Sequence, residues 1–223
     1  MINALTNDSL AETCPRLIEE EAIRAARPTA LRDTFRVELR EHQQRVGKMA
    51  KILAVKVGMP AHHAATIGQA AALHDIGKLF VRGDLFQKAD PLTDDETAEA
   101  RTHTTRGHWA LIKGHDPICK LAARIALEHH ECWDGSGYPA GLSGEAISRE
   151  ARIVTICDVY IALREERPYK RSFSHEEALS IMVCGDERVR PTMFDPAMLA
   201  VFMMHGELFR TWWATDSAEA VAA

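Results

Sequence analysis

Apolar residues recur at helical spacing along most of the chain. Between Val46 and Val57 they fall at positions i, i+3, i+4 and i+7, so they line one face of a helix. Gly58 and Pro60 follow directly and predict the end of that helix. Because no run of alternating β-branched residues indicates a strand, the pattern predicts an all-α bundle.

Local signals predict where other helices begin. Thr93–Glu96 and Ser174–Glu177 both fit a capping box, in which the first and fourth side chains bond each other's backbone N–H groups. Asp195-Pro196 fits an N-cap followed by a proline in the first turn. Two stretches interrupt the helical pattern, residues 83–91 and the glycine-rich residues 133–144. Both are expected to be irregular.

Length and patterning predict a single folded domain. The 223 residues leave little room for a second domain. We expect a short, weakly patterned leader over residues 1–30, the folded domain over 31–215, and a frayed tail over 216–223. No apolar run approaches 18 residues, which excludes a membrane-spanning helix, and the N-terminus lacks the pattern of a secretory signal.

Charge and cysteine content narrow the class of protein. The net charge of −5 argues against a protein that binds a nucleic-acid polymer through phosphate contacts alone. The five cysteines are scattered and show no C-x-x-C spacing, so neither a disulfide framework nor a structural zinc site is expected. A reducing cytoplasm is the natural interpretation.

Ionisable residues interrupt the apolar faces of five predicted helices. On the helix through residues 35–49, Glu38 and His42 stand one turn apart on the stripe that we expect to be buried. The stripe of the next helix continues into His74 and Asp75. Other apolar stripes lead in the same way to further candidate ligands: His103, His129, His130 and Asp158.

These eight side chains comprise five imidazoles and three carboxylates, and burying them unpaired would cost on the order of several kcal/mol each. A lone histidine on an apolar face is more often a core residue bonded to a backbone carbonyl, and that alternative applies to each one separately. As a set, however, imidazole and carboxylate suit Fe, Mn, Zn or Ni, and helical bundles build such sites in their cores. Eight ligands exceed the need of one ion, so two or three ions are predicted.

The same residues carry a family signature. The segment Leu73–Lys78, read LHDIGK, resembles the HD motif of metal-dependent phosphohydrolases. The segment His129–Pro139, read HHECWDGSGYP, resembles the signature of the HD-GYP branch, and residues 167–170, read RPYK, match a segment downstream of it. The resemblance extends over nearly the whole chain.

The resemblance implies a single-domain bundle of about seven helices whose core metal cluster, typically iron or manganese, cleaves cyclic di-GMP. Glu38 matches the carboxylate associated with members that hold three metals; without it, two would be expected. Each of the eight candidates matches a metal ligand of the family: Glu38, His42, His74, Asp75, His103, His129, His130 and Asp158.

The resemblance also assigns substrate contacts. Lys78 matches a lysine that contacts the substrate phosphate or the third metal, and Arg167 and Lys170 match phosphate-binding residues. Gly137 and Tyr138 lie in the glycine-rich loop, for which two interpretations stay open. The loop either recognises the substrate or a partner protein, or it is a compact turn between two helices.

The expected mechanism follows from the metal cluster. Two cations bridged by Asp75 would lower the pKa of a shared water, and the resulting hydroxide would attack phosphorus in line. Lys78 would take up charge that develops on the phosphoryl oxygens. The first product would be the linear dinucleotide pGpG, and a slower second cut would give GMP.

One position departs from the family pattern, and two alternative functions stay open. Ile161 stands where the family usually has an acidic residue, so we expect it to alter the pocket wall or a hydrogen bond near Asp158. One alternative is an enzyme that prefers cyclic GMP-AMP; the other is a non-catalytic module that binds a nucleotide or a protein through the glycine-rich loop. Trp212 and Trp213 are interpreted as core or dimer contacts, which leaves a homodimer open.

Overall fold

The computed structural model describes residues 30–88, 90–166 and 171–222, and this part of the chain is helical without any strand, so the all-α prediction is confirmed. Four 3-10 helices occur in the described part, η1 (Ile76–Phe80), η2 (Gly83–Gln87), η3 (Gly144–Ala146) and η4 (Pro191–Met193). The α-helices are α2 (Ala30–Lys56), α3 (Ala61–Ala71), α4 (Asp94–Arg101), α5 (His103–Leu111), α6 (Pro117–Glu128), α7 (Arg149–Arg164), α8 (His175–Cys184), α9 (Pro196–Met204) and α10 (Gly206–Ala222).

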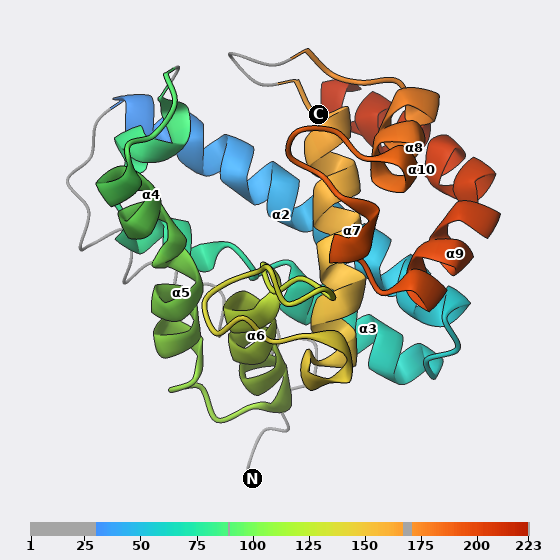
Figure 1. The fold of residues 1–223 in the computed structure, drawn as a ribbon, viewed down its shortest axis with the longest axis horizontal. Helices are drawn as coiled ribbons and strands as arrows, with labels where there is room; N and C mark the ends of the chain where they lie inside the picture. Colours follow the sequence, from blue (N-terminus) through green and yellow to red (C-terminus); the bar gives the residue numbers. More distant parts are fainter. Residues whose placement is uncertain (1–29, 89, 167–170, 223) are drawn as a thin grey trace, which may run out of the picture.

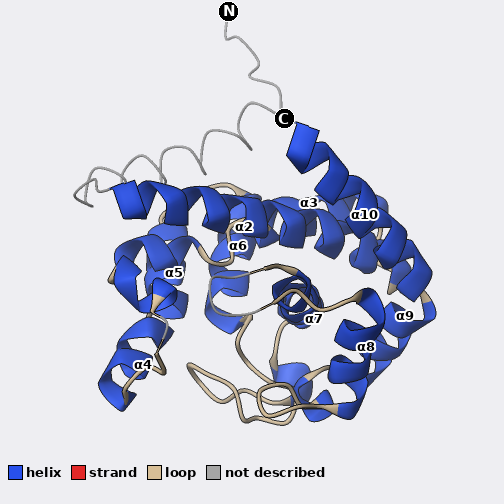
Figure 2. Cartoon of the chain, turned by 90° about the horizontal axis from the view of Figure 1, so that it is seen from above, coloured by secondary structure: helices blue, strands red, loops and turns tan. Residues whose placement is uncertain are grey.

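Helix α7 forms the centre of the bundle. Helix α2 packs against both α3 and α7, while α6 contacts α3, α5 and α7. Figure 1 shows α4, α5 and α6 on one side of α7, and α8, α9 and α10 on the other. In Figure 2, α7 is seen nearly end-on with the other helices around it. A residue near the middle of α7 is therefore close to several elements at once.

The predicted apolar face of α2 is confirmed. Val46, Met49 and Leu53 are fully buried in the main core, and the helix ends at Lys56, just before Gly58 with its positive φ of 86°. The predicted helix starts are also found, as capping boxes that open α4 and α8 and as an aspartate N-cap on α9. These signals act within a few residues, which is why the sequence alone reveals them.

Two predicted continuous helices are broken in the structure, and both breaks place ligands. Helix α3 ends at Ala71, so His74 and Asp75 lie on the turn that leads into η1. Helices α4 and α5 separate at Thr102, so His103 opens a new helix. The backbone of η1 packs directly against this break, because a Cβ on Gly77 would lie only 1.8 Å from the carbonyl oxygen of His103.

The structure describes almost all of the predicted C-terminal tail but only the last residue of the predicted leader. The predicted leader, residues 1–30, lies outside the described residues apart from Ala30, the first residue of α2. Residues 216–222, expected to form a frayed tail, continue α10, and the domain boundary at residue 215 stays a prediction. The Asp216 side chain is buried, with an oxygen 2.6 Å from Nζ of Lys48 on α2.

The structure bears on two expectations from the sequence, one about the cysteines and one about membrane-spanning helices. Among the described cysteines, Cys132, Cys157 and Cys184 are free. Within the described residues, every helix is too short or too polar to span a bilayer.

Candidate metal centre

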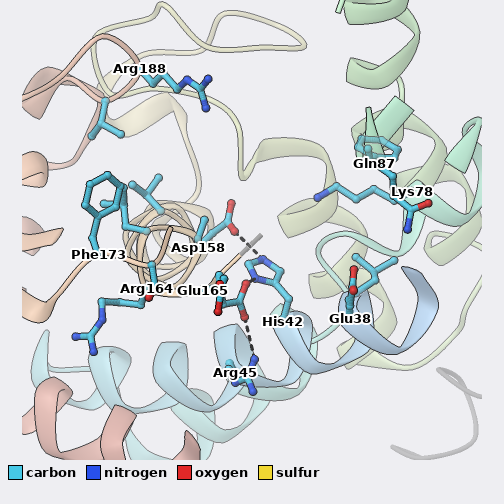
Figure 3. A pocket seen from close by; sticks show the side chains of 18 of the residues that line it. Glu38, His42, Arg45, Lys78, Gln87, Asp158, Arg164, Glu165, Phe173 and Arg188 are labelled. Atoms are coloured by element: carbon cyan, nitrogen blue, oxygen red, sulfur yellow. Dashed lines mark hydrogen bonds and ion pairs between the residues drawn. The ribbon is translucent and has the colours of Figure 1, made fainter. Parts of the chain in front are cut away.

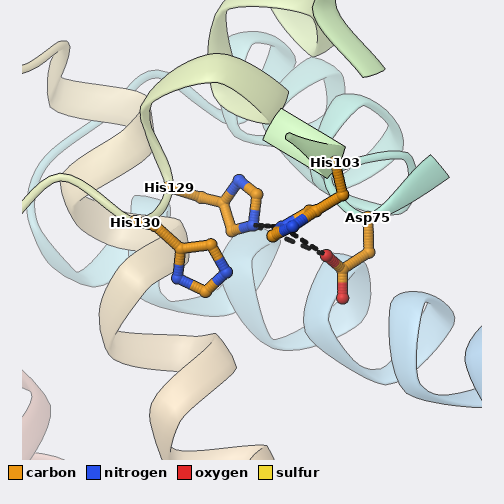
Figure 4. Close-up of side chains that lie close together, drawn as sticks. All are labelled: Asp75, His103, His129 and His130. Carbon is orange, nitrogen blue, oxygen red and sulfur yellow. Dashed lines mark hydrogen bonds and ion pairs between the residues drawn. The ribbon is translucent and has the colours of Figure 1, made fainter. Parts of the chain in front are cut away.

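The first candidate ligand group forms where three helix ends meet. Asp75 precedes η1, His103 opens α5, and His129 caps the end of α6. His130 follows in the chain, and one ligand atom from each of these four residues lies within 4.8 Å of the others. Figure 4 shows the three imidazole rings gathered beside the Asp75 carboxylate.

The ring nitrogens of this group point inward. The Nε2 atoms of His103 and His129 lie 3.4 Å apart, and they lie 3.3 and 3.5 Å from the same Oδ1 of Asp75. The Nδ1 atom of His103 donates to the carbonyl of Ala100 at 2.7 Å, and that of His129 to the carbonyl of Ala126 at 3.0 Å. With their protons on Nδ1, both imidazoles present the Nε2 lone pair to the space beside Asp75, as metal ligands do.

The second group joins α2, the turn after α3, and α7. It consists of His42, His74 and Asp158, whose ligand atoms lie within the same 4.8 Å limit. The Nε2 of His42 is 2.9 Å from Oδ1 of Asp158, and the Nε2 of His74 is 3.8 Å from that oxygen. Asp75 connects the two groups, because its Oδ2 is 3.3 Å from His74 while its Oδ1 faces the first group.

The chemistry of these side chains fits divalent metal ions. Two buried polar atoms at the junction, Nε2 of His74 and Oδ1 of Asp75, have no hydrogen-bond partner among the described residues, a state that costs about 1–3 kcal/mol per group. Burial lowers the pKa of His103 to about 4. Burial would raise the pKa of Asp75, but Lys78 and His74 hold that pKa well below its usual value. Neutral imidazole and ionised carboxylate are the forms that bind metals.

A pocket of about 1260 Å³ opens beside the second group. Figure 3 shows His42 and Asp158 on one wall, with Glu38 and Lys78 across the space from Asp158. The Lys78 ammonium group donates to Oδ2 of Asp75 and lies 5.4 Å from the centre of the Phe86 ring. Lys78 therefore joins the candidate metal ligands to the pocket, and its contact with substrate stays a prediction.

Two sequence expectations need correction at the pocket. Glu38 is exposed and lines the pocket rather than lying on a buried face, because its side of α2 borders the pocket. Its role as a third-metal ligand stays a prediction. Ile161 is fully buried in the apolar core and is not among the described residues that line the pocket; Ala162 and Glu165 are.

The glycine-rich loop packs against the first ligand group. The Tyr138 ring stacks on His130 with centroids 4.8 Å apart, and the guanidinium of Arg101 lies 4.8 Å from the Tyr138 centroid. A Cβ on Gly137 would lie 2.4 Å from the carbonyl oxygen of His130, and the buried Glu131 accepts hydrogen bonds from two backbone N–H groups of the loop. These contacts favour the interpretation as a compact turn. Neither Gly137 nor Tyr138 is among the described pocket-lining residues, so their contact with substrate stays a prediction.

The phosphate-binding assignments of Arg167 and Lys170 lie outside the described residues. A residue just before them was missed by the sequence analysis. Glu165, at the C-cap of α7, has an oxygen 2.8 Å from Nδ1 of His42. Burial would lower the pKa of His42, but its hydrogen bonds with Asp158 and Glu165 raise that pKa to about 9. No local pattern could have indicated Glu165, because its partner lies 123 residues earlier in the chain.

The family model described as "HD domain" matches residues 7–197. The chain belongs to the HD domain family. The resemblance of the LHDIGK segment to the HD motif is thereby confirmed. Membership of the HD-GYP branch, which the HHECWDGSGYP segment indicates, stays a prediction. The match also includes residues 7–30, which were predicted to form a leader, and the domain boundaries stay a prediction.

Curated relatives of this HD domain are named for cyclic-dinucleotide hydrolysis. The chain is 38% identical over 69% of its length to the "Cyclic di-GMP phosphodiesterase response regulator RpfG" of Xanthomonas campestris, matching 39% of that protein. It is 35% identical over 70% of its length to the "3'3'-cGAMP-specific phosphodiesterase 1" of Vibrio cholerae, matching 36% of it. The chain thus spans less than half the length of these relatives.

The fold of this HD domain is found in a solved structure of an HDG"Y"P protein from Bdellovibrio bacteriovorus. The two superimpose with a TM-score of 0.56 over 72% of this chain and 49% of the other, at 20% sequence identity. At that sequence identity the likeness establishes a common fold. The chemistry of the site is argued from the residues of this chain.

Proposed function

We propose that this HD domain is a metal-dependent phosphodiesterase that hydrolyses cyclic di-GMP to pGpG, with a slower second cut to GMP. The observation that carries the proposal is the Asp75 carboxylate, which has one oxygen near each of the two ligand groups. A carboxylate in that position suits two neighbouring divalent ions, and iron or manganese fits a ligand set of imidazole and carboxylate. The names of the curated relatives support the same reaction class.

Different residues would bind the metal ions and the substrate. The ligand side chains would hold two ions, with Glu38 the candidate for holding a third. When bound, such ions supply Lewis acidity and an activated water near neutral pH. The Lys78 ammonium lies beside Asp75 and lines the pocket, so it can bind a phosphoryl oxygen and stabilise the charge that develops there. The pocket volume of about 1260 Å³ exceeds that of most small-ligand sites and is ample for a dinucleotide.

Reconstitution tests the proposal. We expect the metal-free chain, loaded anaerobically with Fe(II) or Mn(II) and incubated with cyclic di-GMP, to give pGpG that chromatography detects. His74→Ala and Asp75→Ala should abolish turnover while circular dichroism shows an intact bundle, because each removes a ligand from the junction of the groups. His63→Ala is the matched control: His63 pairs with Glu150 at 2.8 Å, outside both groups. Retained turnover in either ligand variant would refute the metal-hydrolase function.

A second candidate substrate is cyclic GMP-AMP, favoured by the relative whose name specifies 3'3'-cGAMP. Parallel assays of the two dinucleotides decide between them through the ratio of their kcat/KM values. A chain that binds metal but cleaves neither would support the non-catalytic binding module instead. A homodimer, a protein partner at the glycine-rich loop and a cytoplasmic location stay predictions from the sequence.

A further inference from the structure

His42 differs from three other candidate ligands in what orients its ring. The Nδ1 atoms of His74, His103 and His129 each donate to a backbone carbonyl three residues earlier, at 2.9, 2.7 and 3.0 Å. Because every residue has a backbone carbonyl, a side-chain substitution does not remove such an acceptor. The Nδ1 of His42 instead lies 2.8 Å from Oε2 of Glu165, the C-cap residue of α7. The ring of His42 is therefore oriented by a side chain.

The geometry assigns the two nitrogens of His42 different tasks. Its Nε2 faces the second ligand group, 2.9 Å from Asp158, while Nδ1 faces away from that group toward Glu165 (Figure 3). A carboxylate that accepts from Nδ1–H fixes one proton there, so Nε2, which donates to Asp158 in the metal-free ring, is the nitrogen that would bind a metal after losing its proton. The side chains of His42 and Glu165 are only 8% and 13% exposed, so water competes little for this bond.

Glu165 is itself held in place by α2 and α10. Its second oxygen, Oε1, accepts from Nη1 of Arg45 at 3.1 Å, so each oxygen of the carboxylate has a partner. The Nε of Arg45 lies 3.4 Å from Asp216 on α10, and the exposed fraction of the Asp216 side chain is 8%. A chain of charged contacts therefore runs from the C-terminal helix to a ligand of the second group.

We propose that Glu165 is a positioning residue for the metal ligand His42, and that Asp216 supports it through Arg45. The proposal rests on the metal centre described above and is independent of which dinucleotide is cleaved. Because removing a hydrogen-bonding partner of a metal-bound histidine typically costs about 10- to 100-fold in metal affinity, loss of Glu165 should weaken the second group by that factor. The first group, whose histidines rely on backbone carbonyls, should keep its affinity.

Metal titration of the full chain tests the proposal without any substrate. Mn²⁺ is titrated into metal-free wild type, Glu165→Ala, Glu165→Gln and Glu41→Gln by calorimetry. We expect Glu165→Ala to weaken one class of site about 10- to 100-fold and Glu165→Gln to weaken it less, since the amide oxygen still accepts from Nδ1. Glu41→Gln is the matched control, because Glu41 lies 3.8 Å from the same Arg45 but is exposed and one turn away.

A spectroscopic measurement on the metal-free chain separates positioning from general destabilisation. The ¹⁵N resonances of the histidine rings should shift for one histidine in both Glu165 variants and stay as in wild type in Glu41→Gln. Wild-type Mn²⁺ affinity and unchanged ring resonances in the Glu165 variants would overturn the proposal, as would equal weakening by Glu41→Gln. If Glu165→Ala fails to fold, the near-isosteric Glu165→Gln decides. Wild type that binds Mn²⁺ but cleaves no dinucleotide refutes the proposed function and leaves this inference standing.

Discussion

At the scale of single residues, two residues that are adjacent in the sequence contribute to different candidate ligand groups. His74 and Asp75 are adjacent on one turn, yet His74 belongs to the second group while Oδ1 of Asp75 belongs to the first. Most candidate ligands could be identified from the sequence, because a polar side chain on an apolar stripe is a local signal. Glu38 showed the limit of that signal. Whether a stripe position faces a neighbouring helix or an open pocket depends on how distant segments pack.

Glu38 tests whether a third ion is held. We expect Glu38→Ala to lower the metal content by about one ion per chain, because the exposed carboxylate faces the pocket one turn before His42. Elemental analysis of the reconstituted protein measures this. Glu41→Ala, which removes a carboxylate from the same exposed turn of α2, should leave the content unchanged. Equal stoichiometry in Glu38→Ala and wild type would refute the third-metal role.

At the scale of elements, short interruptions between helices place the ligands more than the helices themselves do. The turn before η1 holds Asp75, the break between α4 and α5 presents His103, and the end of α6 presents His129. The periodicity of apolar residues predicted continuous helices through two of these points. It missed the breaks because they depend on close backbone packing between η1 and α5, which a pattern of apolar positions does not encode.

The substitution Gly77→Ala tests the packing of η1 against α5. A Cβ there would lie 1.8 Å from the His103 carbonyl oxygen, so Gly77→Ala must push η1 away from α5. We expect a loss of at least about 1–3 kcal/mol in the free energy of unfolding, together with weaker metal binding by the first group. Urea denaturation and Mn²⁺ titration measure the two effects.

Gly58→Ala separates steric overlap from backbone strain. Gly58 has a positive φ of 86°, but a Cβ added to it would meet no atom within 4 Å, so this variant should lose about 1–2 kcal/mol and keep its metal affinity. If Gly77→Ala and Gly58→Ala have the same free energy of unfolding and the same Mn²⁺ affinity, the close approach of η1 and α5 does not position His103.

At the scale of the whole molecule, α10 contacts α2 through charged and aromatic side chains. Asp216 pairs with Lys48 at 2.6 Å and with Arg45 at 3.4 Å, and Arg45 lies 5.7 Å from the centre of the Trp213 ring. Trp213 packs against the core and also lines the pocket, which supports the core interpretation of this residue. The C-terminal segment is thus part of the domain that carries the site.

Asp216 tests the contribution of α10 to stability. Asp216→Asn should lower the free energy of unfolding by about 1–3 kcal/mol, because it weakens a buried carboxylate that contacts two cations. Denaturant unfolding measures the loss. Glu207→Gln on the same helix is the control: the Glu207 side chain is 77% exposed in its pair with Arg210, so its loss should cost no more than about 1 kcal/mol. Equal effects of the two variants would contradict a structural role for the Asp216 contacts.

The sequence by itself determined the helical class, several helix boundaries and the residue types of the candidate ligands. Those properties rest on periodicity, capping and residue type, which act over a few positions. Tertiary structure alone decided that Asp75 lies between two groups, that Ile161 belongs to the core, and that Glu165 orients His42. Such contacts join residues far apart in the chain, and their geometry is fixed by helix packing, for which no single segment carries a pattern.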